Sequence, residues 1–407
     1  MNTGNSKYVK KLNRMAIINL IKENEPISRQ EIAEATGLTP PAITGIIREL
    51  IELGFVEEVG LGKSQGGRRP VKLKLNCSVG YVLGVEVTSK EVTFAVADLK
   101  NMPSDIQTIQ LDMTDSETSS QELIRAIKNY MDRHKKKKFL GIGIAFPAIL
   151  QEGVVKRSVN LGPKWCNFPL KSILEKKLHV PVLIDTNSKV AAMGENWFGD
   201  GKLSSNLIYI NIGEGVSAGI LMNGSIIQGT HGNAGQIGHT IILEQGPLCK
   251  CGNRGCLEAV CAGPALAKKV MEELPFIDPS SILKKRFDEN KTIEVKDIIY
   301  AALQEDPYAQ ALFHQVGKYL GMVVSDVINF YNPDEVFIGG KLAIAAEVFI
   351  EDIKEVVSTH AFPEAANSTV IRISKLGANS GAIGACALTL NHLLKSNQFD
   401  MLEDNQG

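Results

Sequence analysis

Apolar residues repeat at helical spacing near the start of the chain. Val9, Leu12, Ala16, Leu20 and Ile21 lie on one face of a predicted first helix, which the stretch EPIS at 25–28 ends. The pattern returns twice before residue 53, in two shorter runs separated by a Gly-containing turn. Three short helices are therefore expected in this order.

The second and third of these helices have recognisable ends. Ser28 suits the N-cap of a helix over 29–36, and Gly37 ends it. Thr39 suits the N-cap of the third helix, because the two prolines that follow it are tolerated in a first turn. The inner face of the third helix is predicted to consist of Ile43, Ile46, Ile47 and Leu50. Two short helices joined by a tight turn form the helix-turn-helix pattern.

A β-wing is predicted to follow the third helix. Two alternating runs, 55–59 and 71–75, flank a Gly-rich loop whose basic tip at 66–70 suits a minor groove. The third helix would enter the major groove through its N-terminal residues, whose small side chains permit close approach to base edges. The predicted DNA-contacting residues are Thr39, Pro41, Ala42, Thr44, Arg48, Arg68 and Arg69. The alternative is a small helical interaction module with a solvated basic loop.

From Val82 onward, strands alternate with helices. The run at 139–150 is almost continuously apolar, as in a strand buried on both faces, and the apolar-turn-apolar theme of 81–99 returns at 206–229. We predict two α/β lobes with a ligand cleft between them, and an irregular surface excursion at 276–298. The predicted domains are a winged helix-turn-helix head at 1–76, a first lobe at 77–200, and a second lobe at 201–407 whose last helix returns to the first lobe.

Composition and charge refine this picture. The formal net charge is −1 at pH 7, but residues 1–76 contain twelve Lys and Arg against eight Asp and Glu. A basic head on a mildly acidic body favours a polyanionic partner for the head. No apolar run reaches the roughly 18 residues of a membrane span, and the polar start lacks the pattern of a signal peptide. A cytoplasmic protein without membrane contact is therefore expected.

One Gly-broken stretch, 238–260, holds a histidine and three cysteines. In a reducing compartment, clustered thiols favour metal binding over disulfides. His239, Cys249, Cys251 and Cys256 supply the four tetrahedral ligands that zinc prefers. Because four protein ligands leave no place for water, the sequence predicts a structural zinc ion rather than a hydrolytic one. The alternative is a chance cluster of reduced thiols.

The stretch GNAGQIGHTIILEQGPLCKCGNRGCLEAV resembles the signature of the ROK family, which comprises repressors and sugar kinases. Four other segments resemble segments of that family, in the same order: GIGIAFPAILQEGVVKRSVNLG, PVLIDTNSKVAAMGE, NPDEVFIGGKL and KLGANSGAIGACAL. The likeness covers residues 80–395, and the head matches the transcriptional repressor branch, of the xylose-repressor type. The resemblance implies an α/β body with an actin-like (ribonuclease H-like), sugar-kinase-like fold and a sugar in its cleft.

The likeness to the kinases fails at the loop that holds phosphate. Glu86 replaces the Asp of their Gly-rich loop, and Thr88, Ser89 and Lys90 stand where glycines are expected. Side chains there would block the close backbone approach that a phosphate needs, and Glu214 in the second Gly turn would repel it. We therefore predict that the chain is not an enzyme. A sugar kinase with a DNA-binding head is the alternative.

The resemblance also implies a sugar site. Asp185 matches the general base of the kinases and is interpreted here as a hydrogen-bond acceptor, while Ile184 replaces an Asn that contacts the sugar. Gln236 replaces a Glu of the family, and an amide both donates and accepts. His239 would bind zinc with one ring nitrogen and a sugar hydroxyl with the other. The predicted sugar-binding residues are Asn160, Asp185, Gln236, His239 and Glu258. For Asn160, Asp185 and Glu258, a capping or surface role is the alternative.

Together these features predict a sugar-responsive transcriptional repressor of carbohydrate-utilisation genes. The head would bind double-stranded operator DNA as a homodimer or a dimer of dimers. A small sugar effector in the cleft would then change the spacing of the two heads. Besides the kinase alternative, a DNA-binding regulator with a decayed sugar site stays open.

Overall fold

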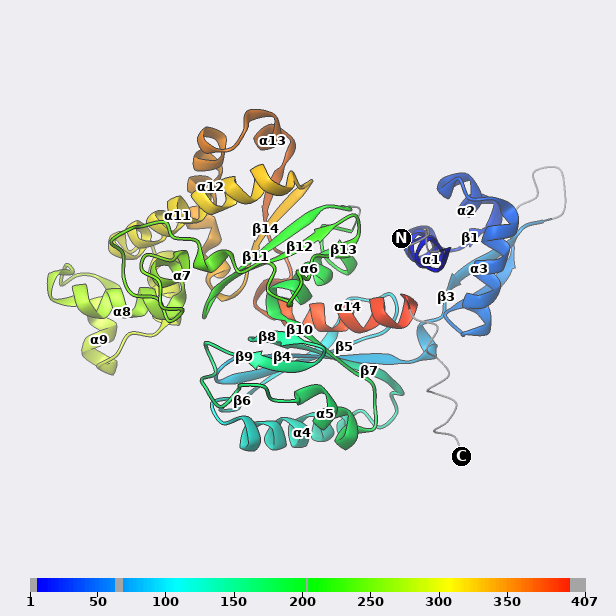
Figure 1. Cartoon of the computed structure of the whole chain (residues 1–407), viewed down its shortest axis with the longest axis horizontal. Coiled ribbons are helices and arrows are strands. Elements are labelled where there is room, and N and C mark those ends of the chain that lie inside the picture. The colour runs from blue at the N-terminus through cyan, green and yellow to red at the C-terminus, as the bar shows by residue number, and fades with distance from the viewer. Residues whose placement is uncertain (1–5, 63–68, 203, 396–407) are drawn as a thin grey trace.

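The computed structural model describes the chain except residues 1–5, 63–68, 203 and 396–407. Arg68, one of the predicted DNA-contacting residues, lies outside the described residues. The described chain forms a small head and a larger two-lobed body (Figure 1). Among these residues, no helix is both long and apolar enough to cross a bilayer.

The head has the predicted three helices and wing. Its elements are α1 (Ser6–Asn24), β1 (Ile27–Ser28), α2 (Arg29–Thr36), α3 (Pro40–Glu52), β2 (Val56–Leu61) and β3 (Val71–Leu75). The strands form one antiparallel sheet in the order β1-β3-β2, and the Gly62 amide donates to the Pro70 carbonyl at 2.7 Å beside the wing loop. The predicted inner face of α3 is buried throughout.

The predicted helix ends in the head are mostly confirmed. Ser28 caps α2 and forms a capping box with Glu31, which satisfies two backbone N–H groups reciprocally. Gly37 follows α2 with φ of 67°, a left-handed conformation that glycine adopts without strain. Thr39 occupies the N-cap position of α3, but its side chain makes no cap hydrogen bond there.

The first lobe is built on a five-stranded sheet in the order β10-β7-β4-β5-β6. Strands β4, β5 and β6 form an antiparallel meander, while β7 and β10 run parallel to β4. The elements of this lobe are β4 (Tyr81–Val87), β5 (Glu91–Ala97), β6 (Ser104–Gln110), α4 (Ser116–Arg133), β7 (Phe139–Phe146), β8 (Ile149–Gln151), β9 (Val154–Arg157), α5 (Leu170–Leu178), β10 (Val182–Thr186) and α6 (Asn187–Trp197). Helices α4 and α5 bury their apolar faces against one side of the sheet.

The second lobe repeats that topology with the order β13-β12-β11-β14-β15. Its strands are β11 (Leu207–Ile212), β12 (Val216–Met222), β13 (Ser225–Ile226), β14 (Glu335–Gly339) and β15 (Val370–Ile373). Its helices are α7 (Leu257–Cys261), α8 (Gly263–Glu273), α9 (Ile282–Asn290), α10 (Val295–Leu303), α11 (Pro307–Tyr331), α12 (Ala346–His360), α13 (Pro363–Ser368) and α14 (Ser380–Lys395). The expectation of an irregular stretch at 276–298 is wrong, because α9 and the start of α10 occupy it and bury a few apolar residues against the core.

Helices α6 and α14 form the layer between the two sheets. Helix α6 packs on β11 and β12 of the second lobe, whereas α14 returns to the first lobe and packs on β4 and β7. Glycines permit these contacts: a Cβ at Gly84 would lie 2.1 Å from the Ala382 carbonyl, and a Cβ at Gly219 would lie 2.1 Å from the Ser188 carbonyl. The backbones of the two helices meet in turn at Gly194 and Gly384.

Substituting a sheet glycine under α14 tests this packing. Gly143 lies opposite Gly84 in the parallel pair β4–β7, and a Cβ there would stand 1.9 Å from the Ala385 carbonyl. We expect Gly143→Ala to lower the free energy of unfolding by about 1–3 kcal/mol, measured by urea titration. The control is Gly213→Ala, whose Cβ would meet its nearest neighbour at 3.6 Å. Equal stabilities of the two variants would contradict the packing argument.

Candidate functional site

A cavity of about 400 Å³ lies between the two lobes. It extends from the first turns of α6 and α14 to the loop that follows β12 and β13. Four of the five predicted sugar-binding residues line it: Asn160, Gln236, His239 and Glu258. Asn160 comes from the first lobe and the other three from the second. The folded chain thus brings together polar side chains that lie up to 98 positions apart in sequence.

Asp185 lies beside this cavity rather than among the described residues that line it; its neighbour Thr186 is one of them. One carboxylate oxygen accepts from the Thr186 amide at 2.7 Å, and the other accepts from Gln228 Nε2 at 2.7 Å. Gln228 in turn accepts from the buried ammonium of Lys189 at 2.8 Å. Burial lowers the pKa of Lys189, and the nearby carboxylate of Asp185 opposes that shift.

Gln228 and Lys189 were missed by the sequence reasoning. Lys189 lies in the first turn of α6, four residues after Asp185, which belongs to β10. Its ammonium also donates to the Gly232 carbonyl at 2.7 Å, so it joins α6 to the loop after β13. Gln228 lies 43 residues from Asp185, and local sequence contains no signal for that pairing.

Glu258 is held at the floor of the cavity by the second Gly turn. Its Oε2 accepts from the Val216 amide at 3.1 Å. A Cβ at Gly215 would lie 2.5 Å from the same oxygen, so only glycine leaves room for the carboxylate there. Glu258 belongs to the first turn of α7, where backbone N–H groups favour a negative charge.

The predicted metal ligands do converge. The ligand atoms of His239, Cys249, Cys251 and Cys256 all lie within 4.8 Å of one another. His239 Nδ1 is 3.7 Å from Cys249 Sγ, and the Sγ atoms of Cys251 and Cys256 are 3.6 Å apart. A tetrahedron with metal–sulfur bonds of about 2.3 Å has edges of about 3.8 Å, so the cluster has the size that such an ion requires.

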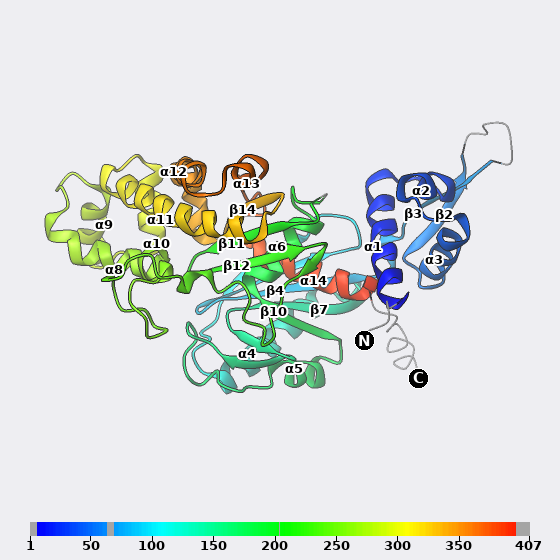
Figure 2. The same ribbon diagram turned by 45° about the horizontal axis from the view of Figure 1, so that its top comes forward.

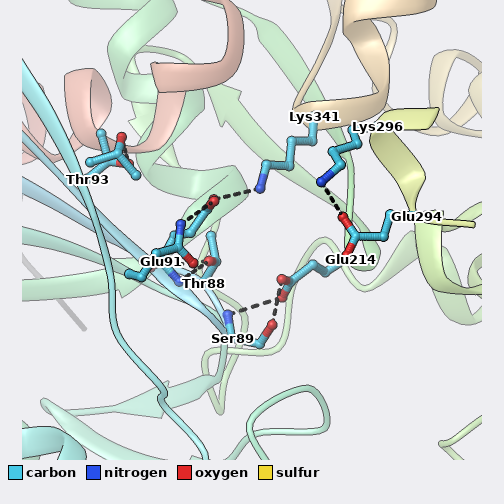
Figure 3. A network of polar contacts seen from close by, with 10 residues as sticks. Thr88, Ser89, Glu91, Thr93, Glu214, Glu294, Lys296 and Lys341 are labelled. Carbon is cyan, nitrogen blue, oxygen red and sulfur yellow. Dashed lines mark hydrogen bonds and ion pairs between the residues drawn. The ribbon is translucent and has the colours of Figure 1, made fainter. Parts of the chain in front are cut away.

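The other end of the cavity is crossed by two polar contacts between the lobes (Figure 3). In the turn between β4 and β5, Ser89 donates to Glu214 from its hydroxyl at 2.6 Å and from its amide at 3.3 Å. Beside it, Lys341 pairs with Glu91 at 2.7 Å. Glu214 and Lys341 belong to the second lobe, so both contacts join the lobes where the resemblance to the kinases would place a nucleotide.

The side chain of Glu86, a residue of β4, lies at the start of α14. Its Oε2 accepts from the Ala382 amide at 3.2 Å, in the place where a helix favours an anion. Burial raises the pKa of Glu86 to about 7, although the Ala382 and Gly381 amides and the charge of Lys341 oppose the shift. A side-chain carboxyl thus fills a position at which a free anion would otherwise be stabilised.

The raised pKa of Glu86 predicts a pH dependence of stability. As the pH rises from 4.5 to about 7, the carboxyl ionises in the unfolded chain before it does so in the fold, so the free energy of unfolding falls. The loss is at most about 3 kcal/mol, and the partial exposure of Glu86 to the cleft reduces it. As the pH is raised from about 5 to about 8, the free energy of unfolding from urea titrations should fall less in Glu86→Gln than in the parent.

A second carboxyl, that of Glu195, limits how much Glu86→Gln can reduce the pH dependence of stability. Burial also raises the pKa of Glu195 to about 7, so it adds a fall of the same sign that persists in the Glu86→Gln variant. The pH dependence should therefore shrink without disappearing. The matched control is Glu244→Gln, at an exposed position. An unchanged pH dependence in Glu86→Gln would contradict the assignment.

The head presents the expected surface at α3 and the wing. Thr39, Pro41, Thr44 and Arg48 are exposed, and Ala42 is half-buried. The Arg48 guanidinium is 3.7 Å from Glu52 in the next turn and stays largely in solvent. Arg69, the predicted DNA-contacting residue of the wing tip that the structure describes, is also exposed.

Comparison with known proteins gives matches over both parts of the chain. A model of the ROK family matches residues 82–392, and a model described as winged helix-turn-helix DNA-binding matches residues 11–57. The xylose repressor of Caldicellulosiruptor bescii is 32% identical, covering 97% of this chain and 100% of the relative. The N-acetylglucosamine repressor of Escherichia coli O157:H7 is 29% identical, covering 99% and 98%.

A solved structure resembles the whole chain. The crystal structure of a ROK family transcriptional regulator, described as a homolog of the E. coli MLC protein, superimposes with a TM-score of 0.80 at 27% identity. The match covers 95% of this chain and 97% of the other. The head and the body therefore occur together in similar proteins. The two relatives named above are repressors named for different sugars.

Proposed function

This chain belongs to the ROK family, and we propose that it is a sugar-responsive transcriptional repressor that binds its effector between the lobes. One observation supports this most strongly. A single chain combines an exposed recognition helix and wing with a polar cavity between two lobes. Its relatives of the same length are named as repressors, and the head adds a DNA-binding module to a body of the sugar-kinase type.

In this proposal α3 enters the major groove. Thr39, Pro41, Ala42 and Thr44 would approach base edges, while Arg48 would contact a phosphate. Arg68 and Arg69 at the wing tip would reach the minor groove. We propose that two copies bind together, because paired half-sites are the usual operators of helix-turn-helix dimers.

The sugar would be held by hydrogen bonds from both lobes. Glu258 would accept from one hydroxyl, while Asn160 and Gln236 would each donate and accept. Asp185, held in place by Gln228, would accept from a further hydroxyl once the sugar draws the lobes together. These groups come from both sides of the cleft, so a bound sugar would stabilise one arrangement of the lobes over another.

Zinc fits the four-residue cluster best, and its role would be structural. Three thiolates and one imidazole are soft ligands at tetrahedral spacing, which suits zinc and fills its coordination shell. His239 faces the thiols with Nδ1 and also lines the cavity, so its second ring nitrogen would serve the sugar. The ion would then hold the loop in the position that binding requires.

The nucleotide end argues against phosphoryl transfer. Glu86 fills the anion position at the start of α14, and Glu214 accepts from the backbone and hydroxyl of Ser89. The Glu86 carboxyl occupies the space that a phosphate would need, and the Glu214 carboxylate would repel the phosphates of ATP. We propose that this half of the cleft holds the lobes together instead. ATP turnover with any sugar, lost on Asp185→Asn, would promote the kinase alternative.

Sugar binding can be tested directly. In calorimetric titrations with D-xylose and N-acetylglucosamine at least one sugar should bind, and Glu258→Gln should weaken it about 10- to 100-fold, since a charge-assisted hydrogen bond is lost. The bound sugar should weaken the affinity of the protein for operator fragments, measured by fluorescence anisotropy. Glu244→Gln, an exposed change in the same loop region, should behave as the parent. Sequence-selective DNA binding that responds to neither these sugars nor their phosphates would leave the decayed-site alternative.

Removing the metal should separate the two functions. Chelation, or Cys251→Ser, should abolish the sugar response while DNA binding persists, because the cluster lies in the second lobe and not in the head. Metal analysis should find one zinc ion per parent chain and a loss in the variant. Cys166→Ser, at an exposed cysteine outside the cluster, is the matched control. A sugar response that survives complete removal of zinc would rule out the positional role.

A further inference from the structure

Helices α6 and α14 both begin at the cleft and end at the head. Asn187 and Ser188 in the first turn of α6, and Ser380 at the start of α14, line the cavity. The opposite ends of the two helices, at Trp197 and Leu394, lie against α1 of the head. Figure 2 shows the end of α14 beside α1. The two helices thus span the body between its proposed ligand site and the DNA-binding module.

Two cationic side chains of α1 hold these helix ends. The Lys22 ammonium donates to the Trp197 carbonyl and stands 4.3 Å from the centre of the Trp197 ring. The Arg14 guanidinium donates to the Leu394 carbonyl at 3.5 Å. The C-terminus of a helix presents unpaired carbonyls and a partial negative charge, so cations bind there favourably.

Arg14 also reaches the recognition helix. Its second terminal nitrogen donates to Glu49 of α3 at 2.8 Å. Arg14 is almost completely buried, whereas Glu49 is partly exposed and also pairs with Lys10 of α1. A displacement of the end of α14 would therefore move the Arg14 guanidinium, which is paired with Glu49 of α3.

Apolar packing makes the same junction continuous. Ile17, Ile18 and Ile21 of α1 belong to one buried cluster with Trp197 and Leu394 of the body. The head therefore does not depend on a flexible linker for its position. It shares part of its core with the two helices that separate the lobes.

We infer that Lys22 and Arg14 are the positioning residues through which α6 and α14 set the orientation of the recognition helix. This inference rests on the proposed sugar-controlled repressor function and names how that control would reach the head. Lobe rotation would shift the two helix ends relative to each other, and the two cations, fixed on one helix, would transmit that shift to α3.

A third contact between head and body supplies the matched control. Glu25, after α1, pairs with Lys100 in the loop after β5 and accepts from the Leu75 amide. This ion pair also joins the head to the body, but it involves neither α6 nor α14. Removing it should weaken the attachment of the head without uncoupling it from the cleft.

The first test measures coupling. For the parent, Lys22→Met, Lys22→Arg and Lys100→Met, sugar affinity is measured by calorimetry, and operator affinity by anisotropy with and without saturating D-xylose or N-acetylglucosamine. The parent ratio of DNA affinities should fall within about 5- to 150-fold. Lys22→Met should bind the sugar, and the operator without sugar, as the parent does, but saturating sugar should then change its operator affinity by no more than about twofold. Lys22→Arg and Lys100→Met should retain the parent ratio of operator affinities. An unchanged ratio in Lys22→Met would overturn the inference.

Conditions should keep Lys22 charged. Burial, followed by the nearby Lys202, lowers the pKa of Lys22 to about 7. The titrations are therefore run at about pH 6, where the ammonium predominates. Arg14 is left intact, because removing a buried guanidinium would leave Glu49 and the end of α14 without their partner and could unfold the head.

The second test needs no sugar, so it decides the inference even if the proposed effector fails to bind. In a Trp165→Phe background, the fluorescence of Trp197 reports on the junction alone, since the chain contains two tryptophans. Glu214→Ala combined with Lys341→Met removes both contacts across the nucleotide end of the cleft, because alanine has no acceptor for the Ser89 donors. This change should shift Trp197 emission when Lys22 is present and much less in Lys22→Met.

Two outcomes of the second test are decisive. If Trp197 emission does not shift when Lys22 is present, although faster amide exchange of β4 and β5 verifies that the cleft has opened, the inference is overturned. Equal shifts with and without Lys22 would also overturn it. Should Trp165→Phe fail to fold, the difference between the parent and Trp197→Phe supplies the same signal.

Discussion

The close approach of α6 and α14 is the contact on which the rest of the structure depends. Their backbones meet where Gly194 faces Gly384, at a distance that leaves no room for a Cβ on either residue. Each helix also lies directly on a sheet, α14 over Gly84 and Gly143, and α6 over Gly219. Two similar sheets are thus joined through two helices rather than through a broad side-chain interface.

This arrangement places helix starts, rather than helix sides, at the cleft. Both α6 and α14 begin there, and unpaired N–H groups favour negative charge at such positions. Here Glu86 fills the start of α14, and Glu214 takes the donors of the β4–β5 turn. Two carboxyl groups of the chain itself therefore accept from the backbone donors at this end of the cleft.

The local parts of this architecture could be predicted from sequence, while the parts made by distant residues could not. Ser28 and Gly37 mark helix ends through their own chemistry, and the metal ligands lie within one short stretch. Strand β6 was missed because it is an edge strand with mostly exposed, polar residues and no alternating apolar pattern. Helix α9 was missed for a similar reason, since its sequence is dominated by charge and only Leu283 is fully buried.

The candidate site divides in the same way. The family resemblance identified Asn160, Gln236, His239 and Glu258, and all four line the cavity. It did not reveal the hydrogen bonds from Lys189 to Gln228 and on to Asp185, because those partners meet only after the two lobes fold together. Likewise, no local pattern links Arg14 to the carbonyl of Leu394, since 380 positions separate them in sequence.

The polar contacts between the lobes at the nucleotide end of the cleft restrict the motion that a bound sugar could cause. Ser89 with Glu214, and Lys341 with Glu91, already join the lobes at the nucleotide end. An exposed ion pair contributes only about 0–1 kcal/mol, whereas the buried backbone contacts between α6 and α14 resist separation of the two helices. A ligand at the sugar end would then rotate one lobe about this fixed edge instead of opening the whole cleft. Rotation about that edge moves the far ends of α6 and α14 most, and those ends lie against the head.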